Sequence, residues 1–340
     1  MKVDLRSDTV TRPTAAMLEA MSCAEVGDDV MGEDPTINAL EQKVATLFGH
    51  EAGLFCPSGT MTNQLGIKVH TRPGDEVICA RASHIYNYEG GGIAMNSGAS
   101  VRLLEGDRGR FTAEEVLANI NADDPHCPRT SLVAVEDTCN RGGGAIWSRD
   151  ELLALREVTR SKGLKFHLDG ARACNRLVAA GDDWAEYGSL FDSISICLSK
   201  GLGAPVGSVL IGPTDFIYWA RRFRKALGGG MRQAGYLAAA GLHALEHHVD
   251  RLAEDHRRAK ILEEALLSTA SVSETLPVET NIVIFKLNQG KVAPEVSVKF
   301  AEHNILANPA SPEHIRFVTH LDFSDDHLQY VCETLPKVLG

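Results

Sequence analysis

The sequence has no long run of apolar residues, and this absence argues against a helix that crosses a membrane. Its longest apolar stretches, such as residues 236–242, fall far short of the ~20 residues that such a helix requires. The N-terminus carries Asp4 and Asp8 where a signal peptide would have an apolar segment. We therefore expect a cytoplasmic protein with no membrane partner.

A basic surface and paired cysteines are also missing. The net charge is −11 and the one dense basic stretch is residues 221–225, whereas a duplex-binding protein needs a broad basic face. The eight cysteines form no C-x-x-C pair of the kind found in zinc sites and redox motifs. His243 and His247 have the spacing of a metal-binding helix, but Ala244 stands where a zinc protease needs glutamate. We expect no nucleic-acid partner and no metal site.

What the sequence does contain is an alternation of strand-like and helix-like segments from about residue 40 to about residue 240. Several of the candidate strands are nearly continuous apolar runs, which suits strands covered by helices on both faces. Between two of them, residues 151–162 place apolar side chains at helical spacing and end at Gly163. The pattern predicts an α/β fold with a mostly parallel sheet, with candidate strands at residues 53–56, 76–80, 131–136, 164–168, 193–198 and 208–211.

The last third of the chain indicates a second, smaller unit. Residues 245–266 repeat apolar side chains at the spacing of one long amphipathic helix, which we expect to connect two domains. Beyond it, residues 281–287 and 315–319 are typical of strands, and residues 294–302 and 324–339 are typical of helices. We therefore predict a large domain, residues 1–245 with an N-terminal arm, and a small C-terminal α/β domain, residues 246–340.

Asp169 and Lys200 each follow the end of a candidate strand. Open α/β sheets bind ligands outside the carboxyl ends of their strands, so the two side chains are expected at one site. An acid and a lysine together match the needs of pyridoxal phosphate, because the lysine forms a Schiff base and the carboxylate keeps the pyridine nitrogen protonated. Taken singly, the lysine would more often be an exposed charge and the aspartate a helix cap.

A phosphate-binding loop is expected at residues 56–63, which follow a strand and open a helix. Free backbone N–H groups and small hydroxyls would converge there on an anion. The alternative is a simple helix cap, and it is less attractive beside the lysine and the aspartate. Residues 201–207 look superficially like a dinucleotide fingerprint, but the third glycine comes one residue late and Pro205 interrupts the helix.

Five segments in order along the chain resemble the low-specificity L-threonine aldolases: residues 4–11, 26–30, 168–172, 197–208 and 228–233. The resemblance runs nearly end to end, and the segment around Lys200 is the most specific part of it. It implies a fold type I pyridoxal phosphate enzyme, with a large cofactor domain and a small C-terminal domain. It also implies a homo-oligomer, a dimer of dimers, whose active sites lie at a subunit interface.

The resemblance also implies a role for each matching residue. The residues expected to be catalytic are Lys200, His84, which would stack on the cofactor ring, and Asp169. The residues expected to bind the cofactor are Gly59, Thr60, His84, Asp169, Arg172, Lys200, Lys225 and Arg232. The residues expected to bind the substrate are Ser7, Arg172, Arg316, Tyr88, Glu89 and Cys139. An arginine suits a carboxylate because its planar fork pairs two oxygens at once.

One segment departs from the family pattern. Members commonly read Glu-Asn-Thr-His-Asn after the fourth strand, whereas residues 136–140 here read Glu-Asp-Thr-Cys-Asn. The family histidine is associated with the β-hydroxyl of the substrate, so Cys139 predicts an altered pocket for the β-substituent. A cysteine has an ordinary pKa near ~8.5 and cannot replace an imidazole as a base without strong activation. The alternative is that Cys139 is only a small packing residue.

The expected reaction is retro-aldol cleavage of a β-hydroxy-α-amino acid to glycine and an aldehyde, with His84 or a bound water as the base. Its partners would be a small amino acid and an aldehyde. A β-eliminating, phenylserine-type or transaminating enzyme would use the same lysine and aspartate, and only the products would separate these activities. A non-catalytic pyridoxal-binding regulator should carry a DNA-binding module, and none is visible in the sequence.

Overall fold

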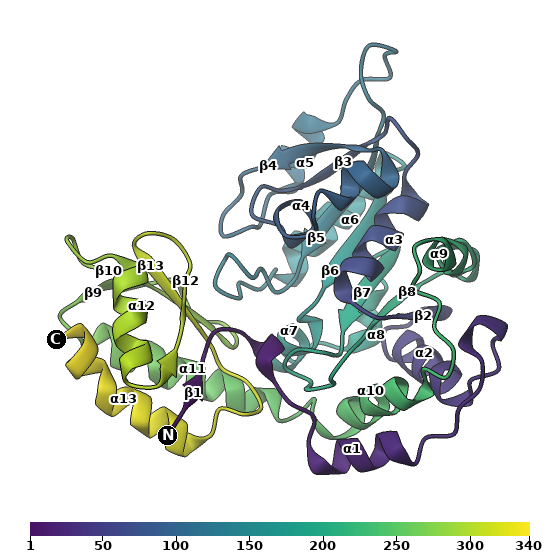
Figure 1. Ribbon diagram of the computed structural model, residues 1–340. Helices are drawn as coiled ribbons and strands as arrows, with labels where there is room; N and C mark the ends of the chain where they lie inside the picture. The colour runs from purple at the N-terminus through teal and green to yellow at the C-terminus, as the bar shows by residue number, and fades with distance from the viewer.

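The computed structural model describes residues 1–340. A sheet of seven strands forms the centre of its larger lobe (Figure 1). The strand order is β2-β8-β7-β6-β5-β3-β4. β8 is antiparallel to its neighbours β2 and β7, and all other neighbours are parallel. The mostly parallel sheet is therefore confirmed. The strands are β2 (Ala52–Cys56), β3 (Glu76–Ala80), β4 (Ser100–Leu104), β5 (Thr130–Glu136), β6 (Lys165–Gly170), β7 (Ser193–Cys197) and β8 (Ser208–Gly212).

Helices cover both faces of this sheet, so its central strands are buried on both sides. α3 (Gly59–His70) and α9 (Thr214–Ala226) pack on one face, and α2 (Pro35–Leu47) and α6 (Arg149–Ser161) pack on the other. Because side chains alternate along a strand, His167, Asp169, Ser193 and Ser195 all point to the face that carries α3. That face is apolar at both ends and polar in the middle.

The smaller lobe is built on a four-stranded antiparallel sheet in the order β12-β13-β10-β9. Its core gathers around Phe285, Phe300 and Phe317, whose rings pack edge to face. The strands and helices expected in this region are present. They are β10 (Ile282–Leu287), α12 (Ala293–Glu302), β13 (His314–Val318) and α13 (Asp325–Leu339). The sheet also contains two strands that were not expected, β9 (Val272–Thr275) and β12 (Asn308–Pro309).

The prediction of a single long helix over residues 245–266 is wrong. The chain instead forms α10 (Gly235–His247) and α11 (Leu252–Leu267), with a break between them. The break is fixed by a tertiary contact, because the ring Nδ1 of buried His248 lies 2.7 Å from the carbonyl oxygen of Leu202. α11 still connects the lobes, since Leu252 lies in the large core and Leu262 in the small one.

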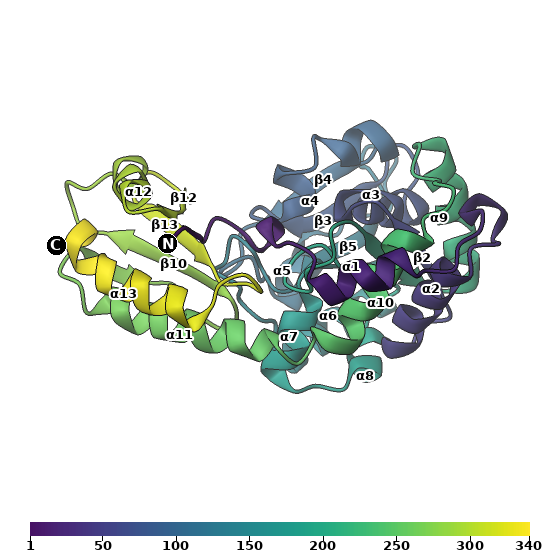
Figure 2. The same cartoon turned by 60° about the horizontal axis from the view of Figure 1, so that its bottom comes forward.

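The N-terminal arm begins in the smaller lobe and then crosses to the larger one (Figure 2). Its strand β1 (Val3–Asp4) pairs in parallel with β11 (Ile305–Leu306), and Leu5 is buried in the C-terminal core. The division after residue 245 remains a prediction, to which the structure adds this pairing of the arm with the smaller lobe. The other helices are η1 (Asp8–Val10), α1 (Ala15–Ser22), η2 (Asp29–Met31), α4 (His84–Asn87), η3 (Ile93–Ser97), α5 (Ala113–Asn119), α7 (Ala173–Ala180) and α8 (Trp184–Gly188).

None of these helices combines the length and the apolar character that a membrane crossing requires.

Candidate functional site

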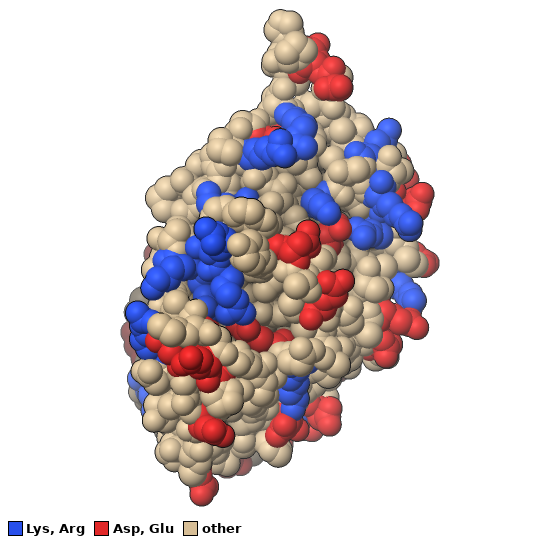
Figure 3. All heavy atoms as spheres, turned by 90° about the vertical axis from the view of Figure 1, so that its right-hand side faces the viewer, with Lys and Arg blue, Asp and Glu red and all other residues tan.

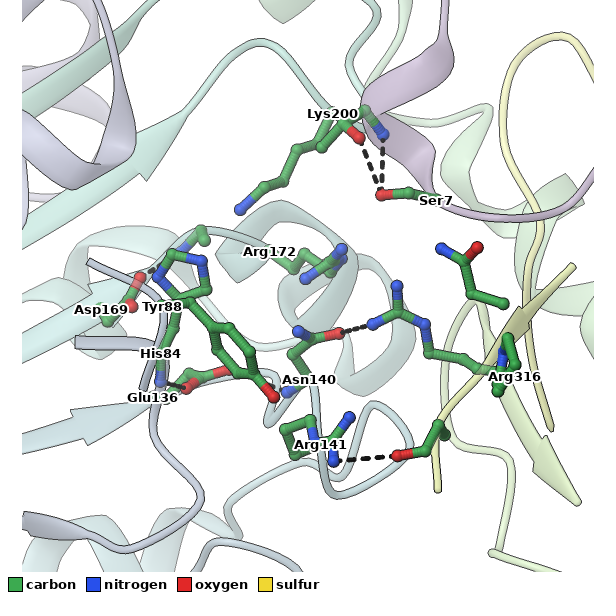
Figure 4. A pocket seen from close by; sticks show the side chains of 15 residues that line it. Ser7, His84, Tyr88, Glu136, Asn140, Arg141, Asp169, Arg172, Lys200 and Arg316 are labelled. Atoms are coloured by element: carbon green, nitrogen blue, oxygen red, sulfur yellow. Dashed lines mark hydrogen bonds between the residues drawn. The ribbon is translucent and has the colours of Figure 1, made fainter. Parts of the chain in front are cut away.

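A cavity of about 430 Å³ lies outside the carboxyl ends of β5, β6 and β7 (Figure 4). This is the place at which open α/β sheets bind ligands. The arm, the large lobe and the small lobe all contribute to it, so the cavity forms only when the two lobes are packed together. Its lining residues are Ser7, Thr9, His84, Tyr88, Glu136, Asn140, Arg141, Asp169, Ala171, Arg172, Lys200, Asn308, Pro309, Ala310 and Arg316.

Lys200 and Asp169 line this cavity together. Asp169 lies at the end of β6 and is 2% exposed, and its Oδ1 accepts a hydrogen bond from the backbone N–H of Ala171 at 3.2 Å. Lys200 follows β7 in the loop after it, and its side chain points toward Asp169 and His84 (Figure 4). The placement that the sequence suggested for this pair therefore exists, and a ring held between them would contact both.

His84 forms the wall beside Asp169 and is held at two atoms. Its backbone N–H donates to Glu136 Oε2 at 2.7 Å, and its ring Nδ1 lies 3.0 Å from Glu89 Oε1. The hydrogen bond to Glu89 raises the pKa of His84 above its ordinary value, although burial opposes the rise. Tyr88 stands next to the imidazole at the mouth of the cavity, with the two ring centres 5.6 Å apart.

Arg141, Arg172 and Arg316 bring three guanidinium groups to the cavity, and of these only Arg172 has a carboxylate partner. Arg172 donates through Nε and Nη2 to the two oxygens of buried Asp8, each at 2.7 Å. Arg316 donates to the amide oxygen of Asn140 at 2.8 Å and to the carbonyl oxygen of Arg6 at 3.1 Å, both of which are neutral. Arg141 donates to the carbonyl oxygen of Ala310 at 3.0 Å and likewise has no anionic partner. Of these two cations, Arg316 is the one expected from the sequence to bind the substrate carboxylate, and its fork suits that role.

The start of α3 fits a phosphate group. Ser58 caps the helix by accepting from the backbone N–H of Met61 at 3.2 Å, while the N–H groups of Gly59 and Thr60 have no acceptor in the chain. Gly59 also lies against β7, because a Cβ atom there would be 2.5 Å from the Sγ of Cys197. The free donors are therefore held next to the strand that leads to Lys200, although Gly59 and Thr60 do not themselves line the cavity. These N–H groups suit the phosphate of pyridoxal phosphate, and Asp169 suits its pyridine nitrogen.

Lys225 and Arg232 do not reach this cavity within one chain. Lys225 is exposed on α9, where it lines a second cavity of about 340 Å³ together with Arg221, Arg222 and Arg224. Arg232 is exposed and donates to Asp28 at 2.8 Å. Figure 3 looks onto the side of the molecule that carries α9, where basic side chains gather in groups with acidic ones between them.

Glu89 and Cys139, which were expected to contact the substrate, do not line the cavity. The Glu89 side chain is fully buried behind His84. Cys139 is also buried, and its Sγ donates to the carbonyl oxygen of Glu136 at 3.0 Å. Burial raises the pKa of this thiol well above its ordinary value, so it stays protonated. In this structure the Glu89 side chain contacts His84, and the Cys139 side chain is buried outside the cavity wall.

Several lining residues were missed from the sequence. Asp8 does not line the cavity but pairs with Arg172, which does; it lay within a segment used for the resemblance, yet its partner is far along the chain. Glu136 and Asn140 flank Cys139, and Glu136 accepts from the backbone N–H of Asn140 at 2.9 Å. The remaining missed residues are Thr9, Arg141, Ala171, Asn308, Pro309 and Ala310.

The side chains of His84, Glu89 and Asp169 have ligand-type atoms within 4.8 Å of one another. Both oxygens of Glu89 already accept hydrogen bonds from N–H donors, so we assign no metal to this group.

Comparison with known proteins identifies the family to which the chain is similar. The model of the β-eliminating lyase family matches residues 4–289. Low specificity L-threonine aldolase of Escherichia coli (strain K12) is 43% identical over 330 residues, which cover 97% of each chain. A probable low-specificity L-threonine aldolase 2 of Arabidopsis thaliana is 41% identical over 343 residues, covering 99% of this chain and 97% of the relative.

Solved structures agree in fold. The structure of a Leishmania major threonine aldolase superposes with a TM-score of 0.87 at 19% identity, covering 99% of this chain and 100% of the other. A putative L-allo-threonine aldolase of Listeria monocytogenes superposes with a TM-score of 0.82 at 23% identity, covering 99% of this chain and 96% of the other. These likenesses bear on the fold alone.

Proposed function

Because the chain belongs to the low-specificity L-threonine aldolases within the β-eliminating lyase family, we propose that it cleaves L-threonine and L-allo-threonine to glycine and acetaldehyde. The enzyme is a carbon–carbon lyase that depends on pyridoxal phosphate. The observation that carries the proposal is the convergence of Lys200, Asp169 and the uncompensated cation Arg316 on one cavity.

The residues present divide into those that would hold the cofactor and those that would hold the substrate. Lys200 would hold pyridoxal phosphate covalently, the free N–H groups of Gly59 and Thr60 would bind its phosphate, and His84 would cover its ring. The cofactor supplies an electron sink for the pair of electrons left behind when a bond to the α-carbon breaks. Asp169, buried and acceptor-only, would keep a positive charge on the pyridine nitrogen.

The substrate carboxylate would pair with Arg316, whose fork matches two oxygens. Arg172 would assist through the guanidinium edge that Asp8 leaves free, and Ser7 would complete the contact from the arm. A carboxylate fixed in this way leaves the side chain of the amino acid directed to the remaining wall, where His84 and Tyr88 lie. The site then recognises the α-carboxylate, which all α-amino acids share. Recognition of this group is compatible with a broad range of β-substituents.

Cleavage requires the loss of a proton from the β-hydroxyl of the substrate. We propose that His84 accepts this proton, either directly or through one water, because its imidazole lines the cavity and the hydrogen bond to Glu89 raises its pKa above the ordinary value. Cys139 cannot share this work, since its thiol lies outside the cavity and remains protonated. The chain is thus proposed to operate with one imidazole at this position.

We also propose that the enzyme is a cytoplasmic homo-oligomer, a dimer of dimers. Lys225 and Arg232 support this arrangement, because both match family residues near the cofactor and neither lines the cavity of its own chain. In an assembly with shared sites, these side chains would serve the cavity of a neighbouring subunit.

Product analysis tests the proposed reaction. The holoenzyme is incubated separately with L-threonine, L-allo-threonine and L-phenylserine, and glycine and the matching aldehyde are quantified with Lys200→Ala as the control. Equal amounts of glycine and aldehyde are expected from the holoenzyme, and none from the variant. Release of ammonia and 2-oxobutanoate from threonine would instead show β-elimination and contradict the proposal.

A further inference from the structure

Glu89 lies at the centre of a buried group of polar side chains between α3 and the sheet. Two clusters of apolar side chains flank this group, one on β3 and β5 and one on β2 and β8. The polar side chains between them come from α3, β6 and β7, and they form consecutive hydrogen bonds from His84 to His70. Polar groups in such a place are costly unless every hydrogen bond is made in a consistent direction.

Glu89 determines which atom donates in each of the first three hydrogen bonds. Its Oε1 accepts from Asn63 Nδ2 at 2.9 Å and faces His84 Nδ1 at 3.0 Å, and its Oε2 accepts from Gln64 Nε2 at 2.6 Å. A carboxylate has only acceptor atoms, so all three neighbours must present N–H groups to it. The proton of neutral His84 is consequently on Nδ1, and Nε2 is the ring nitrogen that no protein group contacts.

The donors and acceptors of the next hydrogen bonds, from Asn63 to His167 and Ser193 in the sheet, follow from this arrangement. Since the amide nitrogen of Asn63 faces Glu89, its oxygen must face His167, whose Nε2 lies 3.2 Å away and must therefore donate. Burial lowers the pKa of His167 to about 4, so the ring is neutral and its Nδ1 is an acceptor. Ser193 lies 2.8 Å from that Nδ1, and its hydroxyl must donate to it.

The last hydrogen bond involves His70, at the C-terminal end of α3. Because the Ser193 proton is directed to His167, the Ser193 oxygen accepts from His70 Nε2, which lies 2.8 Å away. Burial lowers the pKa of His70 to about 3, so this ring is neutral and carries its proton on Nε2. The hydrogen bonds of the Glu89 carboxylate therefore determine the proton positions of three histidines.

We propose that Glu89 is a positioning residue for the reaction: its carboxylate holds the proton of His84 on Nδ1, keeps Nε2 free as the acceptor in the cavity, and orients the chain Asn63–His167–Ser193–His70. The proposal rests on the function proposed above. Glu89 touches neither the cavity nor a bound substrate, so it acts only through His84.

The charged groups that face His84 are the carboxylates of Glu89, Asp169 and Glu136 and the amino group of Lys200. Of these, Glu89 alone bonds directly to the ring. Replacing Glu89 by glutamine removes the negative charge that favours the protonated form of His84. It also places an NH₂ donor where three other N–H donors need an acceptor. The proton of His84 is then no longer fixed on Nδ1.

The experiment combines a pH profile with direct location of protons. In the holoenzyme, Glu89→Gln should move the acidic limb of the kcat profile to lower pH by about one unit or more, and lower kcat about tenfold or more with a smaller change in KM. Glu105→Gln is the matched control, because Glu105 is an exposed glutamate paired with Arg81. The control variant should leave both the acidic limb of the pH profile and kcat unchanged.

Neutron diffraction from crystals of the deuterated wild-type holoenzyme provides a readout that needs neither activity nor a folded variant. Deuterons are expected on Nδ1 of His84, on Nε2 of His167 and on the Ser193 oxygen toward His167. A deuteron on Glu89 or on Nδ1 of His167, or an unshifted pH limb in Glu89→Gln, would overturn the proposal. If glycine is not the product but the deuterons lie as described, the proposed function fails and the positioning stands.

Discussion

Asp8 of the N-terminal arm and Arg172 of the large lobe form a fully buried, two-pronged ion pair, with both nitrogen–oxygen distances at 2.7 Å. The amide of Asn281, from the small lobe, also donates to Asp8 at 3.3 Å. The carboxylate therefore contacts both lobes where they meet. Although burial alone raises the pKa of Asp8, the guanidinium of Arg172 lowers it from 3.8 to about 2.

Asp8→Asn should destabilise the protein by about 3 kcal/mol at neutral pH, because it leaves Arg172 buried without its anion. The folded pKa is depressed, so the contribution of Asp8, about 2 kcal/mol, is present above pH 3.8 and is lost as the pH falls through 2. Denaturant unfolding of wild type and variant between pH 7 and pH 2 checks this. The difference should shrink toward acid, and Asp4→Asn, at a more exposed ion pair on the same arm, should show little change.

Asp169→Asn should lower kcat about 100-fold or more, because the neutral amide no longer stabilises a positive charge at the pyridine nitrogen. The fold should survive, since the amide oxygen can still accept from the N–H of Ala171. Steady-state kinetics with L-allo-threonine, together with cofactor content from absorbance, measures the effect. Unchanged turnover at full cofactor loading would reduce Asp169 to a structural residue.

Asp137 gives a second pH-dependent prediction, of opposite sign. Burial raises its pKa from 3.8 to about 7, although Arg176 and the hydroxyl of Tyr187, which donates at 2.9 Å, oppose the rise. The folded protein therefore binds this proton more tightly than the unfolded chain, and stability falls as the pH rises from about 4 to 7. Asparagine, which is nearly isosteric with aspartate, has no charge to bury.

Asp137→Asn should consequently gain stability relative to wild type by about 2–3 kcal/mol between pH 5 and pH 8. Melting temperatures of both proteins across this range provide the measurement. A constant difference between the two curves would show that Asp137 is ionised throughout.

Cys139→Ser should leave the ratio of activities on L-threonine and L-allo-threonine unchanged, because the thiol does not line the cavity. Cys139→His should instead lower the melting temperature, since Cβ atoms at Gly109 and Gly142 would already lie 3.3 and 3.1 Å from Cys139. Overpacking of this kind costs about 1–3 kcal/mol. If Cys139→Ser changes the ratio of the two activities without changing stability, Cys139 contacts the substrate and the prediction is wrong.

The central strands and the site at their ends could be predicted because their signals are local. The short, largely apolar runs that end before Asp169 and Lys200 are typical of buried strands, and the carboxyl ends of parallel strands lie at one edge of the sheet. β4 was missed because it is an edge strand, with Arg102 half-buried and Ser100 exposed, and so lacks an apolar run. The break before α11 was missed because helical spacing continues through it, while the contact between His248 and Leu202 is tertiary.

Side-chain direction explains the rest of the differences. The sequence places Glu89 and Cys139 within a few residues of cavity-lining residues, but it does not indicate that both side chains turn into the core. The pairing of Asp8 with Arg172 joins residues 164 positions apart, and no local pattern indicates such a contact. The hydrogen-bond chain behind His84 likewise depends on how α3 packs over β6 and β7.

The identity of the cofactor-bearing lysine tests the account most directly. The holoenzyme is reduced with borohydride, which converts the covalent link between pyridoxal phosphate and its lysine into a stable amine, and the digested protein is mapped by mass spectrometry. The account predicts one pyridoxyl group, on Lys200, and none in Lys200→Ala. A label on Lys225 or on any other lysine of the chain would contradict it.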